Sequence, residues 1–251
     1  MRFDKEPTRQ NPDLQLGKMI AHGGSSIVYE MPGGKVAKEA LSSVARDLVG
    51  NQPITKAVLS KIALREAALL PAEKSILLEE AEKAKEKLTN NIAVCKRYLG
   101  DFLVDTDVLI GNNRNSVPVI TIIQDALPKN HITLQPDGWN MTVDDAMRAQ
   151  LQKLITAIEQ MYAETAMMID LLTLANVAFS ASNNKFFIYD VDPLICAPEN
   201  MEALGEQYNV DGWIDHGYTT HNDNVTQNAL EANLEHLEVL KSLLSVAEGN
   251  R

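Results

Sequence analysis

Four oxygen-bearing side chains fall within one short stretch of the C-terminal half: Asp170, Asn176, Asp190 and Asp192. A helix is expected to end near the first of them, a strand follows Asn176, and an apolar strand leads into Asp190. Carboxylate and amide oxygens are hard ligands that suit Mg²⁺, and a carboxylate also accepts or orients a hydroxyl proton. Singly, each residue is a common cap or turn former, so their order carries the interpretation.

A loop of small residues precedes a lysine in the N-terminal part. The loop reads Ala21-His22-Gly23-Gly24-Ser25-Ser26-Ile27-Val28. Small residues let the backbone approach phosphate oxygens and offer its N–H groups to them. Ten residues after Val28 comes Lys38, in an otherwise apolar strand where a cation is costly to bury unless an anion meets it. Taken alone, such a loop more often belongs to an ordinary hairpin.

Taken in order, these residues resemble the signature of the protein-kinase fold superfamily. Ala21, Gly23 and Ser26 stand at the glycine positions of the G-x-G-x-x-G-x-V loop, and Val36-Ala37-Lys38 is similar to the lysine strand that follows it. The stretch 170–192 is similar to the catalytic loop followed by the metal-binding loop. In size alone, the chain also resembles the minimal kinases that some bacteria deliver into host cells.

The resemblance implies ATP and Mg²⁺ as cofactors and gives each of these residues a role. Asp170 would be the catalytic aspartate that orients the acceptor hydroxyl, and Lys38 would position the phosphates. Asn176 and Asp190 would hold Mg²⁺, with Asp192 sharing a second ion. The remaining nucleotide-binding positions would be Ala21, Gly23, Gly24, Ser25, Ser26, Val28, Val36, Gln124 and Ala126.

Kinases pair this lysine with a glutamate on a helix. Glu80 borders the apolar face that Leu77 and Ala84 define, so it is the expected partner of Lys38. Glu66, on the preceding helix, is the alternative. The alternative is that these glutamates only form a solvent-exposed helix face, which is the usual role of Glu-rich helices.

The sequence also departs from the kinase pattern in three places. Met168 and Ile169 replace the histidine and arginine of H-R-D, and six residues separate Asp170 from Asn176 where five are usual. The D-F-G position reads Asp190-Val191-Asp192, without the glycine. In kinases the activation segment lies between the D-F-G and A-P-E tripeptides. Here Ala197-Pro198-Glu199 begins only five residues after Asp192, which leaves no room for that segment, so control by phosphorylation of an activation loop is not expected.

The predicted fold class is α+β: a two-lobed kinase-like fold with a small antiparallel N-terminal sheet, a long helix and an abbreviated, mainly helical C-terminal lobe. The division is a loose tail over 1–14, a nucleotide-binding lobe over 15–126 and a catalytic lobe over 127–251. Pro32-Gly33-Gly34 predicts a hairpin turn, because glycine supplies positive φ. The helical pattern over 54–98 predicts two helices, broken at Pro71 and ended by Gly100.

Further strands are expected over 102–110 and 117–124, the second of them buried on both faces because it is continuously apolar. A helix should begin at a capping box around Thr142 and run to about Met168. A second small hairpin should surround residues 182–185. The last helix should cover 224–247 and pack a leucine stripe on the core.

Composition restricts the partners. With 23 Lys and Arg against 34 Asp and Glu, the net charge is −11, which disfavours nucleic acid and anionic membranes. No apolar run reaches the roughly 18 residues of a membrane helix, so no membrane insertion is expected. Cys95 and Cys196 form no disulfide framework or metal knuckle and are read as reduced, structural thiols. A cytoplasmic protein is predicted, with export into a host cell without a cleaved signal as the alternative.

Three functions stay open. The first is an ATP- and Mg-dependent phosphotransferase, a minimal protein Ser/Thr kinase with a protein substrate or an activating protein partner. The second is a pseudokinase, a binding module without turnover, which the departures from the pattern favour. The third is a small-molecule kinase, for which Glu206, Asp211 and Asp215 would supply acidic groups. A transition-metal site at Asp215-His216, His221 and Asp223 is a minor alternative, since no regular ligand spacing occurs.

Overall fold

The computed structural model describes residues 14, 16–22, 26–49, 54–133, 144–172, 176–215 and 226–245. The chain forms two compact units. Unit 1 comprises Met1–Glu86 and Asp105–Ala126, and unit 2 comprises Lys87–Val104 and Leu127–Arg251. The predicted catalytic lobe began at residue 127, whereas unit 2 also includes the C-terminal part of a long helix.

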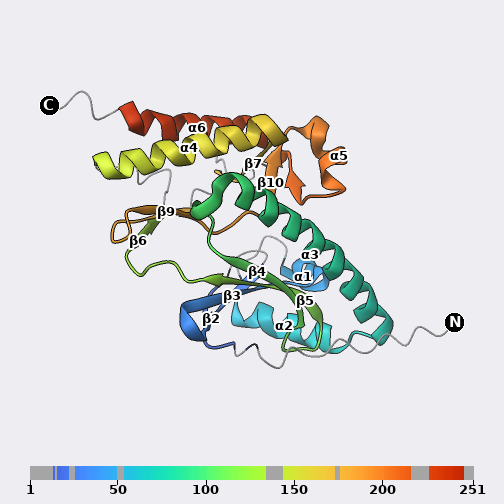
Figure 1. Cartoon of the computed structure of the whole chain (residues 1–251). Helices are drawn as coiled ribbons and strands as arrows, with labels where there is room; N and C mark the ends of the chain where they lie inside the picture. Colours follow the sequence, from blue (N-terminus) through green and yellow to red (C-terminus); the bar gives the residue numbers. More distant parts are fainter. Residues whose placement is uncertain are drawn as a thin grey trace. The chain divides into compact units, whose positions relative to one another are not determined.

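Unit 1 is built on a five-stranded antiparallel sheet in the order β1-β2-β3-β5-β4 (Figure 1). Its strands are β1 Met19–His22, β2 Ser26–Met31, β3 Lys35–Ala40, β4 Thr106–Asn112 and β5 Pro118–Asp125. The turn Pro32–Gly34 joins β2 to β3, as the sequence predicted. Gly33 and Gly34 have φ of 76° and 74°, a conformation that glycine adopts without strain.

Strand β5 is less buried than its apolar sequence predicted. Val119 and Thr121 are buried, whereas Ile120 and Ile122, on the other face, are half-buried. Ile123 is half-buried too, and Gln124 is buried on the face of Ile120 and Ile122, so neither face is buried throughout and the expected burial on both faces is not complete. The loop from β4 to β5 begins at Asn113, two residues later than predicted.

Two helices pack their apolar residues against one face of this sheet. They are α1 Ser43–Val49 and α2 Lys56–Ala67. Ile27 and Tyr29 of β2 form one buried cluster with Ala45 of α1 and with Val58 and Ile62 of α2. This cluster fixes α2 over the sheet, and it places the buried glutamate of α2 described below.

The long helix is α3 Pro71–Leu99, and it begins and ends where the sequence predicted. Pro71 occupies the first turn, where its missing N–H is unneeded. Gly100 follows with φ of 53°, so the break before Pro71 and the stop at Gly100 are both confirmed. The predicted apolar face is buried at Leu77, Ala81, Leu88 and Cys95, whereas Ala84, which was expected on the same face, is exposed.

Unit 2 has two long helices that lie side by side, α4 Asp145–Thr165 and α6 Ala229–Ser245 (Figure 1), and its core also includes residues of the short strands and the end of α3. The expected end of the first helix near Met168 is wrong, because Ala166 has a left-handed φ of 57° and residues 167–169 form a strand. The N-cap is Asp144, whose side chain accepts from the Met147 N–H, and Thr142 lies outside the described residues. The last helix begins at Ala229, later than the predicted 224.

Short strands complete unit 2. One three-stranded sheet has the order β6-β8-β9, from His131–Thr133, Val177–Ser180 and Lys185–Ile188. Another has the order β11-β10-β7, from Val210–Asp211, Leu194–Cys196 and Met167–Ile169, and β12 Trp213–Asp215 pairs with β13 Thr226–Asn228. The β8–β9 hairpin confirms the prediction, and a short helix, α5 Met201–Gly205, follows Pro198.

The leucine stripe of α6 packs on the core as predicted: Leu237 and Leu240 are buried, and Leu234 and Leu244 are partly buried against them. Cys95 and Cys196 are both free and buried, and burial raises the pKa of Cys95 to about 12. No described helix is long and apolar enough to cross a membrane. The α+β class with an antiparallel N-terminal sheet is confirmed.

Candidate functional site

The structure brings Asp170 and Asn176 together. Asp170 follows the fully buried strand β7, and one of its carboxylate oxygens accepts from the Leu172 N–H at 2.8 Å. The Asn176 side-chain amide donates to the other carboxylate oxygen and to the Asp170 carbonyl, both at 3.3 Å. Because the amide nitrogen is directed to Asp170, the side-chain oxygen of Asn176 is its remaining acceptor, which suits a hard cation.

Asp190 leaves the same hairpin that Asn176 enters. Val177 pairs with Ile188, and beyond this pair the Tyr189 N–H donates to the Asn176 carbonyl at 3.2 Å. Asp190 is the next residue, so Asn176 and Asp190 emerge at one end of the hairpin. Burial raises the pKa of Tyr189, and the charge of Asp190 raises it further, which is consistent with a carboxylate close to the phenol.

A buried asparagine that sequence reasoning missed holds the backbone around Asp170. Asn233 of α6 is 0% exposed. Its side-chain oxygen accepts from the Leu171 N–H at 2.7 Å, and its amide donates to the Ile169 carbonyl at 2.9 Å. Asn233 thus holds the backbone on both sides of Asp170, at Ile169 and at Leu171. A polar residue in the otherwise apolar stripe of the last helix was the signal that could have identified it.

A second buried asparagine organises the chain around Asp192. Asn91 of α3 donates to the Val191 carbonyl at 3.1 Å and to the Asn209 carbonyl at 2.9 Å, and accepts from the Asn209 N–H at 3.1 Å. Asn209 in turn donates its side-chain amide to Asp192 at 2.6 Å. Asp192 is exposed, and one of its oxygens is occupied by this contact. Its role with a second Mg²⁺ stays a prediction.

In unit 1 the expected phosphate-binding lysine shares a sheet face with two predicted neighbours. Val28 lies directly opposite Lys38 in the β2–β3 ladder, and Val36 is two residues before it. Opposed residues and alternate residues lie on the same face, so Val28, Val36 and Lys38 form one half-buried surface. Gln124 is opposite Val36 and on that face too.

The expected adenine-binding segment is partly engaged in the sheet. The Gln124 side-chain amide donates to the Thr106 hydroxyl at 3.0 Å. The Ala126 N–H donates to the Gly34 carbonyl at 2.8 Å, so an adenine contact through this N–H would have to displace that bond. Adenine binding by 124–126 stays a prediction.

The loop of small residues is described only at its ends. Ala21 lies in β1, opposite Val28, and Ser26 begins β2. A register irregularity between Met19 and Ala21 interrupts the ladder just before the loop. Gly23, Gly24 and Ser25 lie outside the described residues.

Neither candidate glutamate is seen to meet Lys38. Glu80 accepts from the Ser43 hydroxyl of α1 at 2.8 Å, in an exposed position. Glu66 is buried and lines a cavity on the face of the sheet opposite to Lys38, because the cavity contains Glu39, the neighbour of Lys38 in β3. The pairing of Glu80 with Lys38 therefore stays a prediction.

Asn176 and Asp190 fit a magnesium ion of the kind that takes few protein ligands. Mg²⁺ typically keeps waters and binds through one or two protein oxygens together with substrate phosphates. Within the described ranges, no group of three or more His, Cys, Asp or Glu side chains is arranged to hold a metal ion. The histidines 216 and 221 and Asp223 lie outside those ranges, as does the Asp215 side chain.

No protein-family model matches the sequence, and no curated protein matches it either. The structure is similar to that of PK-1, a kinase of the Cydia pomonella granulovirus, with a TM-score of 0.42 and 10% sequence identity. The match covers 94% of this chain and 89% of that one. At this identity and TM-score, the similarity says nothing about the activity of this protein. The likeness to bacterial effector kinases stays a comparison of size.

Proposed function

We propose that the protein is an ATP- and Mg-dependent phosphotransferase with a kinase-like arrangement, acting on the hydroxyl of a protein Ser or Thr. The observation that carries the proposal is the contact of Asn176 with Asp170 at the end of the hairpin from which Asp190 emerges. Three oxygen-bearing side chains of the expected order, separated by up to 20 residues, are thereby gathered at one end of a hairpin in unit 2.

Each residue would perform one step of the chemistry. The Asp170 carboxylate, held by the Leu172 N–H and Asn176, would accept a hydrogen bond from the attacking hydroxyl and keep its lone pair aimed at the phosphorus. Asn176 and Asp190 would hold Mg²⁺, which when bound neutralises charge on the phosphates. Lys38 would contact phosphate oxygens from its half-buried face. Catalysis of this kind depends on positioning, for which the buried Asn233 is a second support.

The test is phosphoryl transfer from labelled ATP by the full chain with Mg²⁺ and a generic protein acceptor. Turnover should fall by about 10²-fold or more in Asp190→Ala, because a metal ligand is lost. Asp101→Ala is the matched control, an exposed aspartate of the same unit outside the proposed site, and it should retain activity. Equal turnover by wild type and Asp190→Ala would overturn the assignment.

A binding module without turnover is the second candidate. The contact of Asn209 with Asp192 favours it, because it occupies one oxygen of the expected ligand of a second ion. Calorimetry distinguishes the two functions. A module would bind ATP with an affinity that Mg²⁺ and Asp190→Ala leave unchanged, and it would transfer no phosphate.

A further inference from the structure

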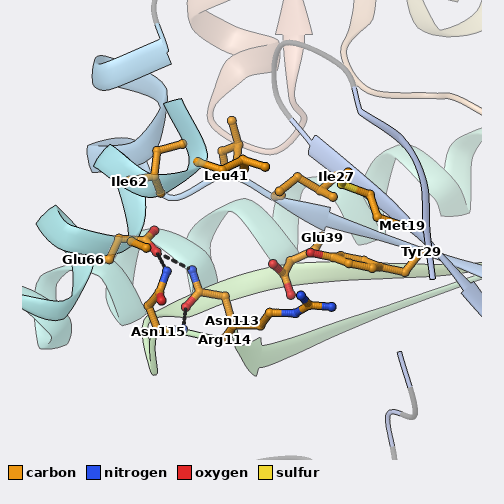
Figure 2. Close-up of a pocket in the computed structure, with 13 residues that line it drawn as sticks. Met19, Ile27, Tyr29, Glu39, Leu41, Ile62, Glu66, Asn113, Arg114 and Asn115 are labelled. Atoms are coloured by element: carbon orange, nitrogen blue, oxygen red, sulfur yellow. Dashed lines mark hydrogen bonds between the residues drawn. The ribbon is translucent and has the colours of Figure 1, made fainter. Parts of the chain in front are cut away.

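A cavity of about 290 Å³ lies within unit 1, on the sheet face that α2 covers. Figure 2 shows that its charged and amide side chains come from three elements: Glu39 from β3, Glu66 from α2, and Asn113, Arg114 and Asn115 from the loop between β4 and β5. The proposed phosphotransfer residue of unit 1, Lys38, points to the opposite face. The cavity is therefore separate from the site proposed above.

Glu39 is a buried carboxylate without a hydrogen bond from any residue that the structure describes. It is 7% exposed and lies opposite Ile27 and Thr121 in the sheet, with its carboxylate directed into the cavity (Figure 2). A buried polar group without a partner is destabilising, and a charged one more so. The Arg114 guanidinium offsets part of this cost electrostatically but makes no hydrogen bond or ion pair with Glu39 among the described residues, so the carboxylate oxygens remain available to a donor from a ligand.

Glu66 is buried too, yet its hydrogen bonds are satisfied. It is 1% exposed and accepts from the Ser42 hydroxyl at 2.7 Å and from the side-chain amides of Asn113 and Asn115 at 2.9 and 2.7 Å. The Asn113 side-chain oxygen accepts from the N–H groups of Asn115 and Val117, which holds the loop in place. Glu66 thus gives the cavity a carboxylate whose oxygens are already occupied, and a preformed rim.

The charges of the lining leave an excess of negative groups. Arg114 is the one Lys or Arg side chain among the described lining residues, against two glutamates. Its guanidinium lies over the Tyr29 ring, 5.3 Å from the centroid, which holds it at the wall. The rest of the wall is apolar and includes Met19, Ile27 and Ile62. A ligand that complements this lining carries one positive charge and an apolar body.

We propose that this cavity binds a small organic monocation, a primary or secondary amine on a short aliphatic or aromatic body, whose ammonium group donates to the Glu39 carboxylate. An anion would face two carboxylates. A bare metal ion would face an apolar wall with Glu39 as the one carboxylate not already occupied by donors. The volume lies near the lower end of the range of small-molecule sites.

The affinity of the cavity for an ammonium ligand should depend on pH, because Glu39 is ionisable. Burial raises the pKa of Glu39 to about 7, with Arg114 lowering it and Glu66 raising it. These two groups and Tyr29 are the titratable side chains that line the cavity around it. Because an aliphatic ammonium stays protonated well above neutral pH, affinity should rise as the pH passes through 7 and Glu39 ionises.

The experiment compares benzylamine with its neutral analogue benzyl alcohol, titrated into the full chain at about pH 8. Methyl NMR of Met and Ile follows binding, since Met19 and Ile27 line the cavity. Benzylamine should bind at least about 10-fold more tightly than the alcohol, as expected for one charge-assisted hydrogen bond, and shift both methyl signals. At about pH 6 the preference should shrink, because Glu39 is then largely protonated.

Glu39→Gln is the decisive variant, since it keeps the shape and accepts no charge-assisted bond. It should abolish the preference for the amine and its pH dependence. Glu30→Gln, on the neighbouring strand at an exposed position outside the cavity, should leave both unchanged. The proposal is overturned if the alcohol binds as tightly as the amine, if neither shifts the Met19 and Ile27 signals, or if Glu39→Gln keeps the preference.

Discussion

The acidic residues that line the two candidate sites, one in each unit, occupy opposite kinds of environment. In unit 1, Glu39 of β3 and Glu66 of α2 lie between the sheet and the helix and are 7% and 1% exposed. In unit 2, Asp170 and Asp190 lie just after strand ends and are half-buried. A carboxylate after a strand end can meet solvent and a large ligand, whereas one in the middle of a packed face meets only what fits a cavity.

Acid content alone therefore does not locate a catalytic site. Glu66 accepts hydrogen bonds from three side chains of unit 1 and is 1% exposed, so nothing large can approach it. Asp170 accepts from the Leu172 N–H and the Asn176 amide and remains half-buried. We infer that the environment of Asp170 serves chemistry, that of Glu66 serves stability, and that of Glu39 serves a small ligand.

The largest effect is expected from Asp170→Asn. This change keeps the shape and removes the acceptor of the hydroxyl proton, so phosphoryl transfer should fall by roughly 10²- to 10⁴-fold. Thermal unfolding should change only modestly, because Asn can still accept from the Leu172 N–H, although its amide nitrogen cannot accept from Asn176. Steady-state turnover and a melting curve on the same preparation check both parts. A large loss of stability with retained turnover would give Asp170 the structural role that we assign to Glu66.

The mirror experiment is Glu66→Ala. Three donors, from Ser42, Asn113 and Asn115, would lose their acceptor in a buried place, so the free energy of unfolding should fall by about 3 kcal/mol. Urea denaturation measures this change. A drop below about 1 kcal/mol would show that Glu66 is not the structural acid proposed here.

Glu39 predicts a stability that depends on pH. Its pKa is about 7 in the folded protein against an ordinary value of 4.5, so the folded state holds more protons between these values. The stabilisation that Glu39 contributes is fully present below its ordinary pKa of 4.5 and is lost as the pH rises through about 7. The free energy of unfolding should fall by on the order of 3 kcal/mol over this range. Urea denaturation at several pH values should show this loss in wild type and a flatter profile in Glu39→Gln. Parallel profiles would contradict the burial of an ionisable group there.

The smallest effect is expected from Glu80→Gln. This exposed side chain accepts one hydrogen bond from Ser43, which Gln can still accept, so stability should stay within about 0.5 kcal/mol of wild type. The same variant tests the predicted partner of Lys38. A several-fold rise in the KM for ATP would support that pairing, and an unchanged KM would remove Glu80 from the site.

Much of the fold could be predicted because the signals were local. Glycines with positive φ marked the hairpin turn and the end of the long helix, and Pro71 marked its beginning. The order of Asp170, Asn176 and Asp190 around a predicted hairpin was enough to expect them at one end of it. The strand β7 was missed because three buried residues after a helix show no period of their own.

The cavity of unit 1 could not be predicted because its contacts are not local. Ser42, Glu66 and Asn113 are 24 and 47 residues apart in sequence and meet only in the folded sheet. The role of Asn233 likewise depends on a contact 62 residues away. Sequence pattern shows which face a residue takes, but not which distant donor will meet it there.

The most direct test of the central claim uses Mn²⁺ in place of Mg²⁺, because it requires no knowledge of the acceptor. Electron paramagnetic resonance would follow binding of Mn²⁺ with ATP to the full chain, to Asp190→Ala and to the control Asp101→Ala. The account predicts a bound Mn²⁺–ATP signal in wild type and in the control, and its loss in Asp190→Ala. A bound signal of equal strength in all three proteins would contradict it.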